Sequence, residues 1–232
     1  MEDPVKNVKK LAALKAISYI KDGMTLGLGT GSTAYWAIQG IGERVRQGLQ
    51  VRAIATSMQS DSLARDAGIP IVSFADINHL DVTIDGADEV DEKLNLIKGG
   101  GGALLREKIV ASATLFYIII VDETKLVGRL GKFPLPVEVA QFGWEMTLLQ
   151  LSKLGCKPVL RSVDHKPFLS DNGHYILDCA FGEISKPALL HEQVNAITGV
   201  MDNGLFINMA DVVIAGYKDG STKLIERAGV KG

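Results

Sequence analysis

The sequence predicts an α/β protein, in which a doubly wound, mostly parallel sheet is joined to a smaller α+β unit. Three observations lead to this class. Up to residue 121, short apolar segments alternate with segments of helical periodicity. Residues 115–121, LFYIIIV, are apolar throughout, which is typical of a central strand in a parallel sheet. Beyond them the expected order changes to β-α-β-β-α-β, that of a ferredoxin-like unit.

The first region opens with a helix. Asp3 followed by Pro4 has the pattern of an N-cap and a first helical residue, and apolar residues then recur at helical spacing, with Gly23 ending the helix. The remaining elements follow in order: strand 24–29, a helix from 32–33 through Ile41, strand 51–56, helix 57–68, strands 69–74 and 80–88, helix 102–113 and strand 115–121.

The second region begins at residues 131–139, whose prolines predict an edge strand or a connection. It continues with helix 142–154, strands 157–162 and 174–181, helix 187–197 and strand 199–207. Residues 210–217, ADVVIAGY, resemble the first region again and are expected to return to the main sheet. We therefore expect a main domain of residues 1–131 plus 205–232 and a smaller domain of residues 132–204.

Composition excludes several classes of protein. The 232 residues are 47% hydrophobic and 22% charged, with a net charge of −2, as in an ordinary globular protein. No basic block indicates nucleic-acid binding, and no apolar run approaches the ~20 residues of a membrane span.

The N-terminal segment lacks the continuous apolar stretch of a signal peptide, so we expect a cytoplasmic protein. In that compartment Cys156 and Cys179 are expected as reduced thiols, although one disulfide is the alternative.

The stretch GLGTGSTA, from Gly27 to Ala34, lies between an expected strand and an expected helix. Glycines let the backbone approach an anion, the helix N-terminus offers N–H groups, and Thr30, Ser32 and Thr33 add hydroxyls. The spacing G-x-G-x-G fits neither a dinucleotide loop nor a P-loop. The stretch therefore favours binding of a phosphate or a similar anion over a turn that serves only packing.

Two further stretches follow. DGADEVD places Asp85 and Asp88 at the carboxyl end of a strand, where α/β sheets bind ligands, although a solvated acidic turn explains this stretch by itself slightly better. KGGGGALLREK places Lys98 before a run of four glycines and Glu107 on the following helix. Consecutive glycine N–H groups can form a nest for a developing oxyanion. Together the stretches suit a small phosphorylated sugar whose carbonyl enolises, since enolisation needs a base and oxyanion donors.

The combination resembles a known family. GLGTGSTA, DGADEVD, KGGGGALLREKIV and LGKFPLPVEV occur in the order of the signature stretches of type A ribose-5-phosphate isomerases, and the resemblance extends to DNGLFINMADVVIAG. It implies a Rossmann-like domain with a ferredoxin-like lid domain, interconversion of ribose 5-phosphate and ribulose 5-phosphate through a cis-enediolate, no metal or organic cofactor, and a homodimer or tetramer. One departure is Gly102, where many members have alanine.

The resemblance also implies roles for individual residues. Glu107 matches the catalytic base, with Lys98, Asp85 and Asp88 as further catalytic groups. The substrate-binding residues that it implies are Lys9, Thr30, Gly31, Ser32, Thr33, Asp85, Gly86, Ala87, Asp88, Lys98, Gly99, Gly100, Gly101 and Lys125.

Two other functions share parts of this architecture. A sugar-phosphate-sensing module would require a helix-turn-helix partner, and the chain has no basic recognition segment. A coenzyme A transferase would use a glutamate as a nucleophile but needs a larger acyl-CoA site. The isomerase explains Lys98, Glu107 and both aspartates together, whereas each alternative explains only one or two of them.

Overall fold

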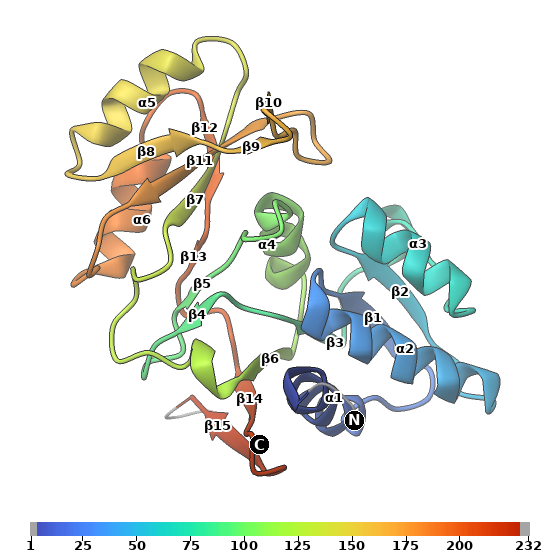
Figure 1. Cartoon of the computed structure of the whole chain (residues 1–232). Coiled ribbons are helices and arrows are strands. Elements are labelled where there is room, and N and C mark those ends of the chain that lie inside the picture. The colour runs from blue at the N-terminus through green and yellow to red at the C-terminus, as the bar shows by residue number, and fades with distance from the viewer. Residues whose placement is uncertain (1–3, 228–232) are drawn as a thin grey trace. The chain divides into compact units, whose positions relative to one another are not determined.

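The computed structural model describes residues 4–227, and the chain divides into two compact units (Figure 1). Unit 1 contains the chain up to Ala87, Arg106–Leu126 and the chain from Met209 onward. Unit 2 contains Asp88–Leu105 and Val127–Asn208. Unit 2 therefore includes residues 88–105, which the sequence analysis assigned to the main domain, and it extends from 127 to 208 where 132–204 was expected.

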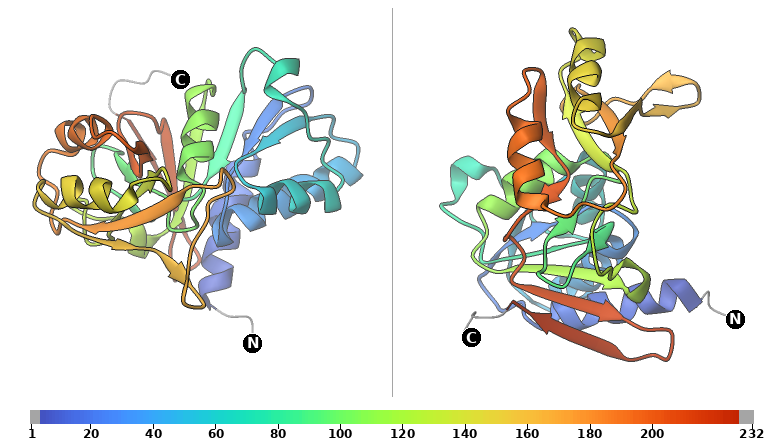
Figure 2. Two further views of the ribbon diagram at one scale, coloured as in Figure 1. Left: turned by 90° about the horizontal axis from the view of Figure 1, so that it is seen from above. Right: turned by 90° about the vertical axis from the view of Figure 1, so that its left-hand side faces the viewer.

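Unit 1 is built on a six-stranded sheet with the strand order β15-β14-β6-β3-β1-β2. Its strands are β1 (Thr25–Leu28), β2 (Arg52–Ala55), β3 (Val82–Asp85), β6 (Tyr117–Asp122), β14 (Val212–Gly216) and β15 (Thr222–Glu226). Neighbouring strands from β14 to β2 are parallel, and only β15 is antiparallel to its neighbour, β14 (Figure 2, right). The apolar β6 lies between β3 and β14, as the sequence predicts for a central strand.

Helices pack on both faces of this sheet. α1 (Pro4–Ile17), α2 (Ser32–Arg46) and α3 (Met58–Asp66) contribute Ala12, Ile38 and Ala64 to one apolar cluster. α4 (Leu104–Ser112) contributes Val110 to a separate cluster with Ile54 and Leu80. Because successive side chains of a strand point to opposite faces, Leu26 and Leu28 of β1 join the first cluster while Gly27 faces Val110. The doubly wound arrangement is confirmed.

Unit 2 has the predicted β-α-β-β-α-β order. Its elements are β7 (Leu135–Val139), α5 (Trp144–Ser152), β8 (Lys157–Leu160), β11 (Tyr175–Ala180), α6 (Pro187–Asn195) and β12 (Val200–Asn203). The sheet order is β12-β7-β11-β8 and all pairs are antiparallel. Leu151 of α5 and Val194 of α6 pack with Val137 and Leu177 of the strands, so both helices cover one face of the sheet (Figure 1).

Several short strands complete unit 2. β4 (Glu89–Val90), β5 (Leu96–Ile97) and β13 (Leu205–Phe206) form a three-stranded antiparallel sheet in the order β13-β5-β4. β9 (Ser162–Val163) and β10 (Lys166–Pro167) form a hairpin between β8 and β11. The sequence analysis predicted none of these as separate strands.

Two predicted elements differ from the structure. Residues 131–139 were expected to begin with an edge strand or a connection: residues 131–134 are a connection, but the strand that follows, β7, is central and pairs with both β11 and β12. The carbonyl of Pro136 accepts a hydrogen bond from Gly204 N, just beyond the last residue of β12, Asn203. The N–H that proline lacks would point to the same side, where the pairing with β12 has ended, so the central strand tolerates Pro136. Residues 69–74 form no strand: Ile71 makes one bridge to Ala53, and a 3₁₀ turn, η1 (Phe74–Asp76), follows.

The first helix is shorter than predicted. α1 ends at Ile17, and Ser18, Tyr19 and Ile20 continue with tighter hydrogen bonds to residues three positions earlier. Gly23, which was expected to end the helix, instead has φ +82° in the turn before β1. The predicted N-cap, Asp3, lies outside the described residues.

Between residues 4 and 227, no helix is long and apolar enough to span a membrane. Cys156 and Cys179 are both buried as free thiols, and no disulfide joins them. A hydrogen bond between the two side chains, together with burial, raises the pKa of Cys179 far above its usual range.

The close approach of strands at Gly27 leads to a stability prediction. A Cβ at this position would lie 2.0 Å from Thr83 Oγ1 and 2.7 Å from Val110 Cγ1. We expect Gly27→Ala to lower the free energy of unfolding by about 1–3 kcal/mol, because the buried sheet must shift to admit the methyl group. Urea unfolding measures the difference. Gly128→Ala is the matched control, since a Cβ there meets no atom within 4 Å, and an equal loss in both variants would contradict the prediction.

Candidate active site

The loop that joins β1 to α2 carries the first predicted site residues of unit 1. β1 ends at Leu28 and α2 begins at Ser32, with Gly31 as its N-cap at φ 102°. This conformation favours glycine and leaves the N–H groups of the first helical turn at the loop. Lys9 Nζ donates to Ser32 Oγ over 2.8 Å, so the fold brings these two predicted residues together. Thr33 lies half-buried in the same turn.

The Thr30 hydroxyl is tied to the chain that follows β2. Thr30 Oγ1 lies 2.7 Å from Thr56 Oγ1 and 2.8 Å from Ser57 Oγ, and Ser60 Oγ donates to Gly29 O over 2.7 Å. These hydroxyls hold the loop in place. The sequence analysis missed Thr56, Ser57 and Ser60, although the hydroxyl-rich run ATSMQS directly after a strand was a signal for them.

Asp85 is the point at which the elements of this site meet. The residue is fully buried at the carboxyl end of β3. Its Oδ1 accepts hydrogen bonds from Thr30 N (3.2 Å) and Gly86 N (2.7 Å), and its Oδ2 accepts one from Tyr117 Oη (3.2 Å). A Cβ at Gly29 would lie 2.1 Å from Asp85 Oδ1, so only glycine fits beside this carboxylate.

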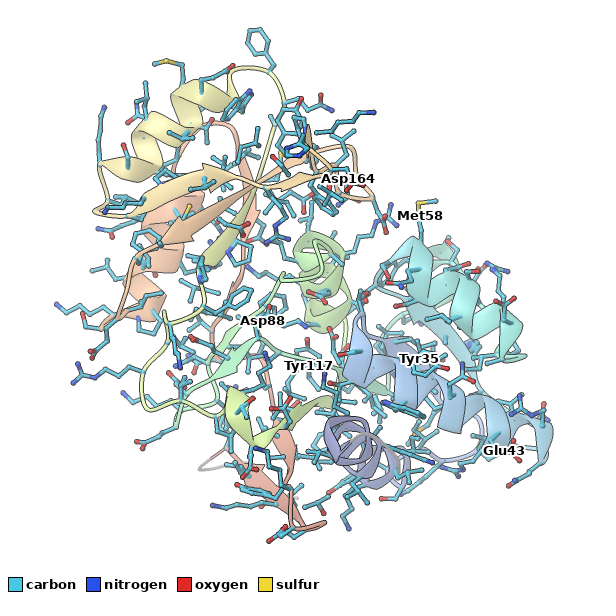
Figure 3. The ribbon with its side chains drawn as sticks, in the orientation of Figure 1. Tyr35, Glu43, Met58, Asp88, Tyr117 and Asp164 are labelled. Atoms are coloured by element: carbon cyan, nitrogen blue, oxygen red, sulfur yellow. The ribbon has the colours of Figure 1, made fainter. Side chains whose placement is uncertain are left out.

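Tyr117 donates a hydrogen bond to Asp85 and lies within electrostatic range of the predicted base, Glu107. Glu107 lies in the first turn of α4 and is 5% exposed. Burial, and then the negative charges of Asp85 and Glu107, raise the pKa of Tyr117 well above its usual range. Tyr117 lies at the start of β6 (Figure 3). The raised pKa keeps its hydroxyl a neutral hydrogen-bond donor. The sequence analysis assigned it only to an apolar strand, in which it is the one side chain with a hydroxyl.

Lys125 lies just beyond the carboxyl end of β6, the strand that pairs in parallel with β3. It ends a 3₁₀ turn, η2 (Glu123–Lys125), which Asp122 caps by accepting a hydrogen bond from Thr124 N over 3.1 Å. Within the described chain, no hydrogen bond or ion pair joins Lys125 to the other predicted site residues. Gly86 and Ala87, also predicted, are half-buried at the end of β3, where the chain leaves unit 1.

Unit 2 contains the other predicted residues. Asp88 is half-buried, and its Oδ2 accepts a hydrogen bond from Gly100 N over 2.8 Å (Figure 3). Lys98 follows β5 and is 2% exposed, with Nζ 5.5 Å from the ring centroid of Phe206. An ammonium over an aromatic face is stabilised electrostatically. The fold of unit 2 thus holds both a carboxylate and a buried lysine next to the glycine run.

The glycine run forms a tight turn before α4. Gly99 and Gly102 have φ values of +101° and +82°, and Gly102 N donates to Gly99 O over 2.9 Å. A Cβ at Gly100 would lie 2.5 Å from Asp88 Oδ1, so side chains are excluded there as well. Gly100 and Gly101 are exposed. The run therefore presents backbone rather than side chains, as an anion-binding nest requires.

In the range 4–227, no group of three or more histidine, cysteine, aspartate or glutamate side chains has an arrangement that could hold a metal ion.

Comparisons with known proteins show which family the chain is similar to. The family described as ribose 5-phosphate isomerase A (phosphoriboisomerase A) matches residues 52–220. A ribose-5-phosphate isomerase A from Bacillus mycoides (strain KBAB4) is 51% identical over 215 residues, which cover 92% of this chain and 97% of the relative.

Solved structures give the same result. A ribose 5-phosphate isomerase A from Methanocaldococcus jannaschii superposes with a TM-score of 0.90 at 41% identity, covering 94% of this chain and 98% of the other. A D-ribose-5-phosphate isomerase in complex with phospho-erythronic acid gives a TM-score of 0.93 at 41% identity, covering 96% and 99% of the two chains.

The bond between Tyr117 and Asp85 can be tested by its contribution to stability. We expect Tyr117→Phe to lower the free energy of unfolding by about 1–3 kcal/mol, because a buried carboxylate loses a donor. Tyr35→Phe is the control: Tyr35 is 39% exposed on α2, and its replacement should change stability by no more than about 0.5 kcal/mol. Unfolding free energies of the two variants that differ by less than the experimental error would remove Tyr117 from this role.

Proposed function

The chain belongs to the ribose 5-phosphate isomerase A family, and from this premise we propose that it isomerises ribose 5-phosphate and ribulose 5-phosphate with Glu107 as the base. The observation that carries this function is the similarity of nearly the whole chain to ribose-5-phosphate isomerases at about half of its positions. The reaction belongs to the pentose phosphate pathway.

Proton transfer is the central step. Glu107 removes the proton from C2 of the open-chain aldose, the C2–H electrons form the C1=C2 double bond, and the carbonyl oxygen on C1 becomes negative. The same carboxyl group then delivers the proton to C1, while the proton of the C2 hydroxyl is lost and O1 is protonated. A buried glutamate suits this task, since one carboxylate can serve adjacent carbons and burial excludes competing water.

Stabilisation of the enediolate is assigned to unit 2. We assign this role to the Lys98 ammonium and the backbone N–H groups of the glycine run, which are preorganised donors of the kind that stabilise oxyanions. The buried position of Lys98 supports the assignment, because electrostatic interactions are stronger away from water.

Substrate binding and ring opening use the remaining residues. Lys9, Ser32, Thr33 and the N–H groups at Gly31 are assigned to the anionic end of the substrate, together with Lys125. Of the two aspartates, Asp88 is the better candidate for proton transfer during ring opening, because it is half-buried whereas Asp85 is fully buried and bonded to Thr30, Gly86 and Tyr117. Asp85 then acts by holding the substrate loop.

Two further properties are part of the proposal, and the second of them rests on the resemblance alone. The protein is expected to be cytoplasmic and to form a homodimer or tetramer. Sedimentation velocity of the purified chain measures the second property directly, and a monomer at working concentration would contradict it.

Replacement of the base is the most direct test. We expect Glu107→Gln to lower kcat by at least ~10²-fold with little change in KM, because the amide keeps the shape but cannot accept the proton. Ketose formation from ribose 5-phosphate measures activity, and solvent deuterium in recovered sugar phosphate measures proton abstraction. Glu92→Gln, an exposed glutamate, is the matched control. Near wild-type turnover by Glu107→Gln would transfer the role of base to Asp85 or Asp88.

Metal dependence gives a second test. Since Lys98 and backbone N–H groups are proposed as the electrophiles, activity should survive exhaustive treatment with EDTA. The measurement is the initial rate before and after treatment. A loss of activity that a divalent cation restores would overturn this part of the mechanism.

A further inference from the structure

Arg161, which directly follows β8, holds the glycine run of unit 2 through its guanidinium group. Nε and Nη2 both donate to the carboxylate of Asp178, with Nε 2.9 Å from Oδ2. Nη1 donates to the carbonyl oxygens of Gly99 (2.9 Å) and Gly100 (3.2 Å). The Arg161 side chain is 14% exposed. One charged group therefore spans from the sheet of unit 2 to the carbonyl side of the glycine turn.

The guanidinium is fixed on several sides. Asp178 lies on β11, which has a strand on each side. Arg161 N donates to Ile176 O and Arg161 O accepts from Phe168 N, each over 2.9 Å. The Phe168 ring centroid lies 5.8 Å from the guanidinium carbon, and a Cβ at Gly102 would lie 2.4 Å from Phe168 Cζ. These contacts restrain the guanidinium of Arg161 against the turn that it binds.

The carbonyls that Arg161 binds determine where the adjoining N–H groups point. The C=O of one residue and the N–H of the next share a planar trans peptide and point in opposite directions. The Gly99 carbonyl therefore belongs with the Gly100 N–H, which donates to Asp88 Oδ2 over 2.8 Å. The Gly100 carbonyl belongs with the Gly101 N–H, for which residues 4–227 supply no acceptor. Gly101 is exposed, so this N–H is available to a ligand.

We propose that Arg161, held by Asp178, is a positioning residue for the isomerisation: it fixes and polarises the Gly100–Gly101 peptide so that the Gly101 N–H donates to the enediolate oxygen. The inference rests on the proposed function. Glycine accepts both signs of φ, so without the guanidinium this peptide can turn over and present a carbonyl that repels the oxyanion. A cation at the carbonyl also strengthens the N–H at the other end of the peptide. Arg161 acts without touching the substrate.

The experiment compares Arg161→Met with wild type. Loss of an oxyanion donor costs about 10²–10³ in kcat, and loss of its positioning should cost part of this, a fall of roughly 10- to 100-fold. KM for ribose 5-phosphate should stay within about threefold, since the ground-state carbonyl carries no full charge. Phospho-erythronic acid has a carboxylate in place of the reacting carbons, so its inhibition constant should rise in parallel with the loss of kcat/KM. If Arg161 only stabilised the fold, its loss would not change kcat and the inhibition constant while leaving KM nearly unchanged.

Further variants complete the test. Arg129→Met is the matched control, because Arg129 pairs with Glu183 at the surface and its loss should leave kcat and the inhibition constant unchanged. Asp178→Asn keeps Arg161 but removes its charged partner, and Arg161→Lys keeps the positive charge but loses the planar guanidinium with its several donors. Both variants should show a smaller fall in kcat and a smaller rise in the inhibition constant than Arg161→Met. If circular dichroism shows that Arg161→Met is unfolded, the kinetics of Asp178→Asn and Arg161→Lys test the proposal in its place.

Wild-type kcat in folded variants overturns the proposal, and so does an equal weakening of substrate and inhibitor binding with kcat unchanged. A wild-type protein that does not isomerise ribose 5-phosphate refutes the proposed function itself.

Discussion

The buried carboxylate of Asp85 is the interaction on which the rest of unit 1 depends. A charge removed from water needs hydrogen-bond donors, and this one has Thr30 N, Gly86 N and Tyr117 Oη. These donors come from the loop after β1, from the chain after β3 and from β6. Satisfying one charge therefore fixes the ends of three neighbouring strands. It also explains why Gly29 has no side chain, since the carboxylate occupies that space.

Unit 2 uses the same principle with backbone groups in place of side chains. Asp88 accepts from the N–H side of the glycine turn, and Arg161 donates to its carbonyl side. A chain of consecutive glycines has high conformational entropy, and these two charged groups restrict it. The turn keeps the access that glycine permits without the mobility that usually comes with it.

The sequence predicted the order of the large elements because their signals are local. The apolar run of β6 and the helical periodicities can be recognised without knowing the fold. Glycine likewise marks positions where a backbone must approach another group. Two-residue strands such as β4 and β5 have too few residues for any periodicity. The edge strand was expected because Pro136 lacks an N–H. The strand beside it, β12, lies about 65 residues further along the chain, so nothing local indicated that this N–H would not be needed. The sequence analysis did not identify Tyr117 and Arg161 as site residues for the same reason, because their partners depend on strand register and tertiary packing.

The order in which the parallel strands are synthesised has a consequence for the folding of the chain in the cell. β6 has hydrogen-bonding edges on both sides, and its partner on one side, β14, begins at Val212, long after Asp122 has left the ribosome. At translation rates of about 5–20 residues per second, that edge waits on the order of ten seconds. An exposed strand edge is a template for pairing with another chain, and four of the six residues of β6 are aliphatic. The unpaired edge of β6 is therefore a site at which the nascent chain can pair with another chain until β14 has been synthesised.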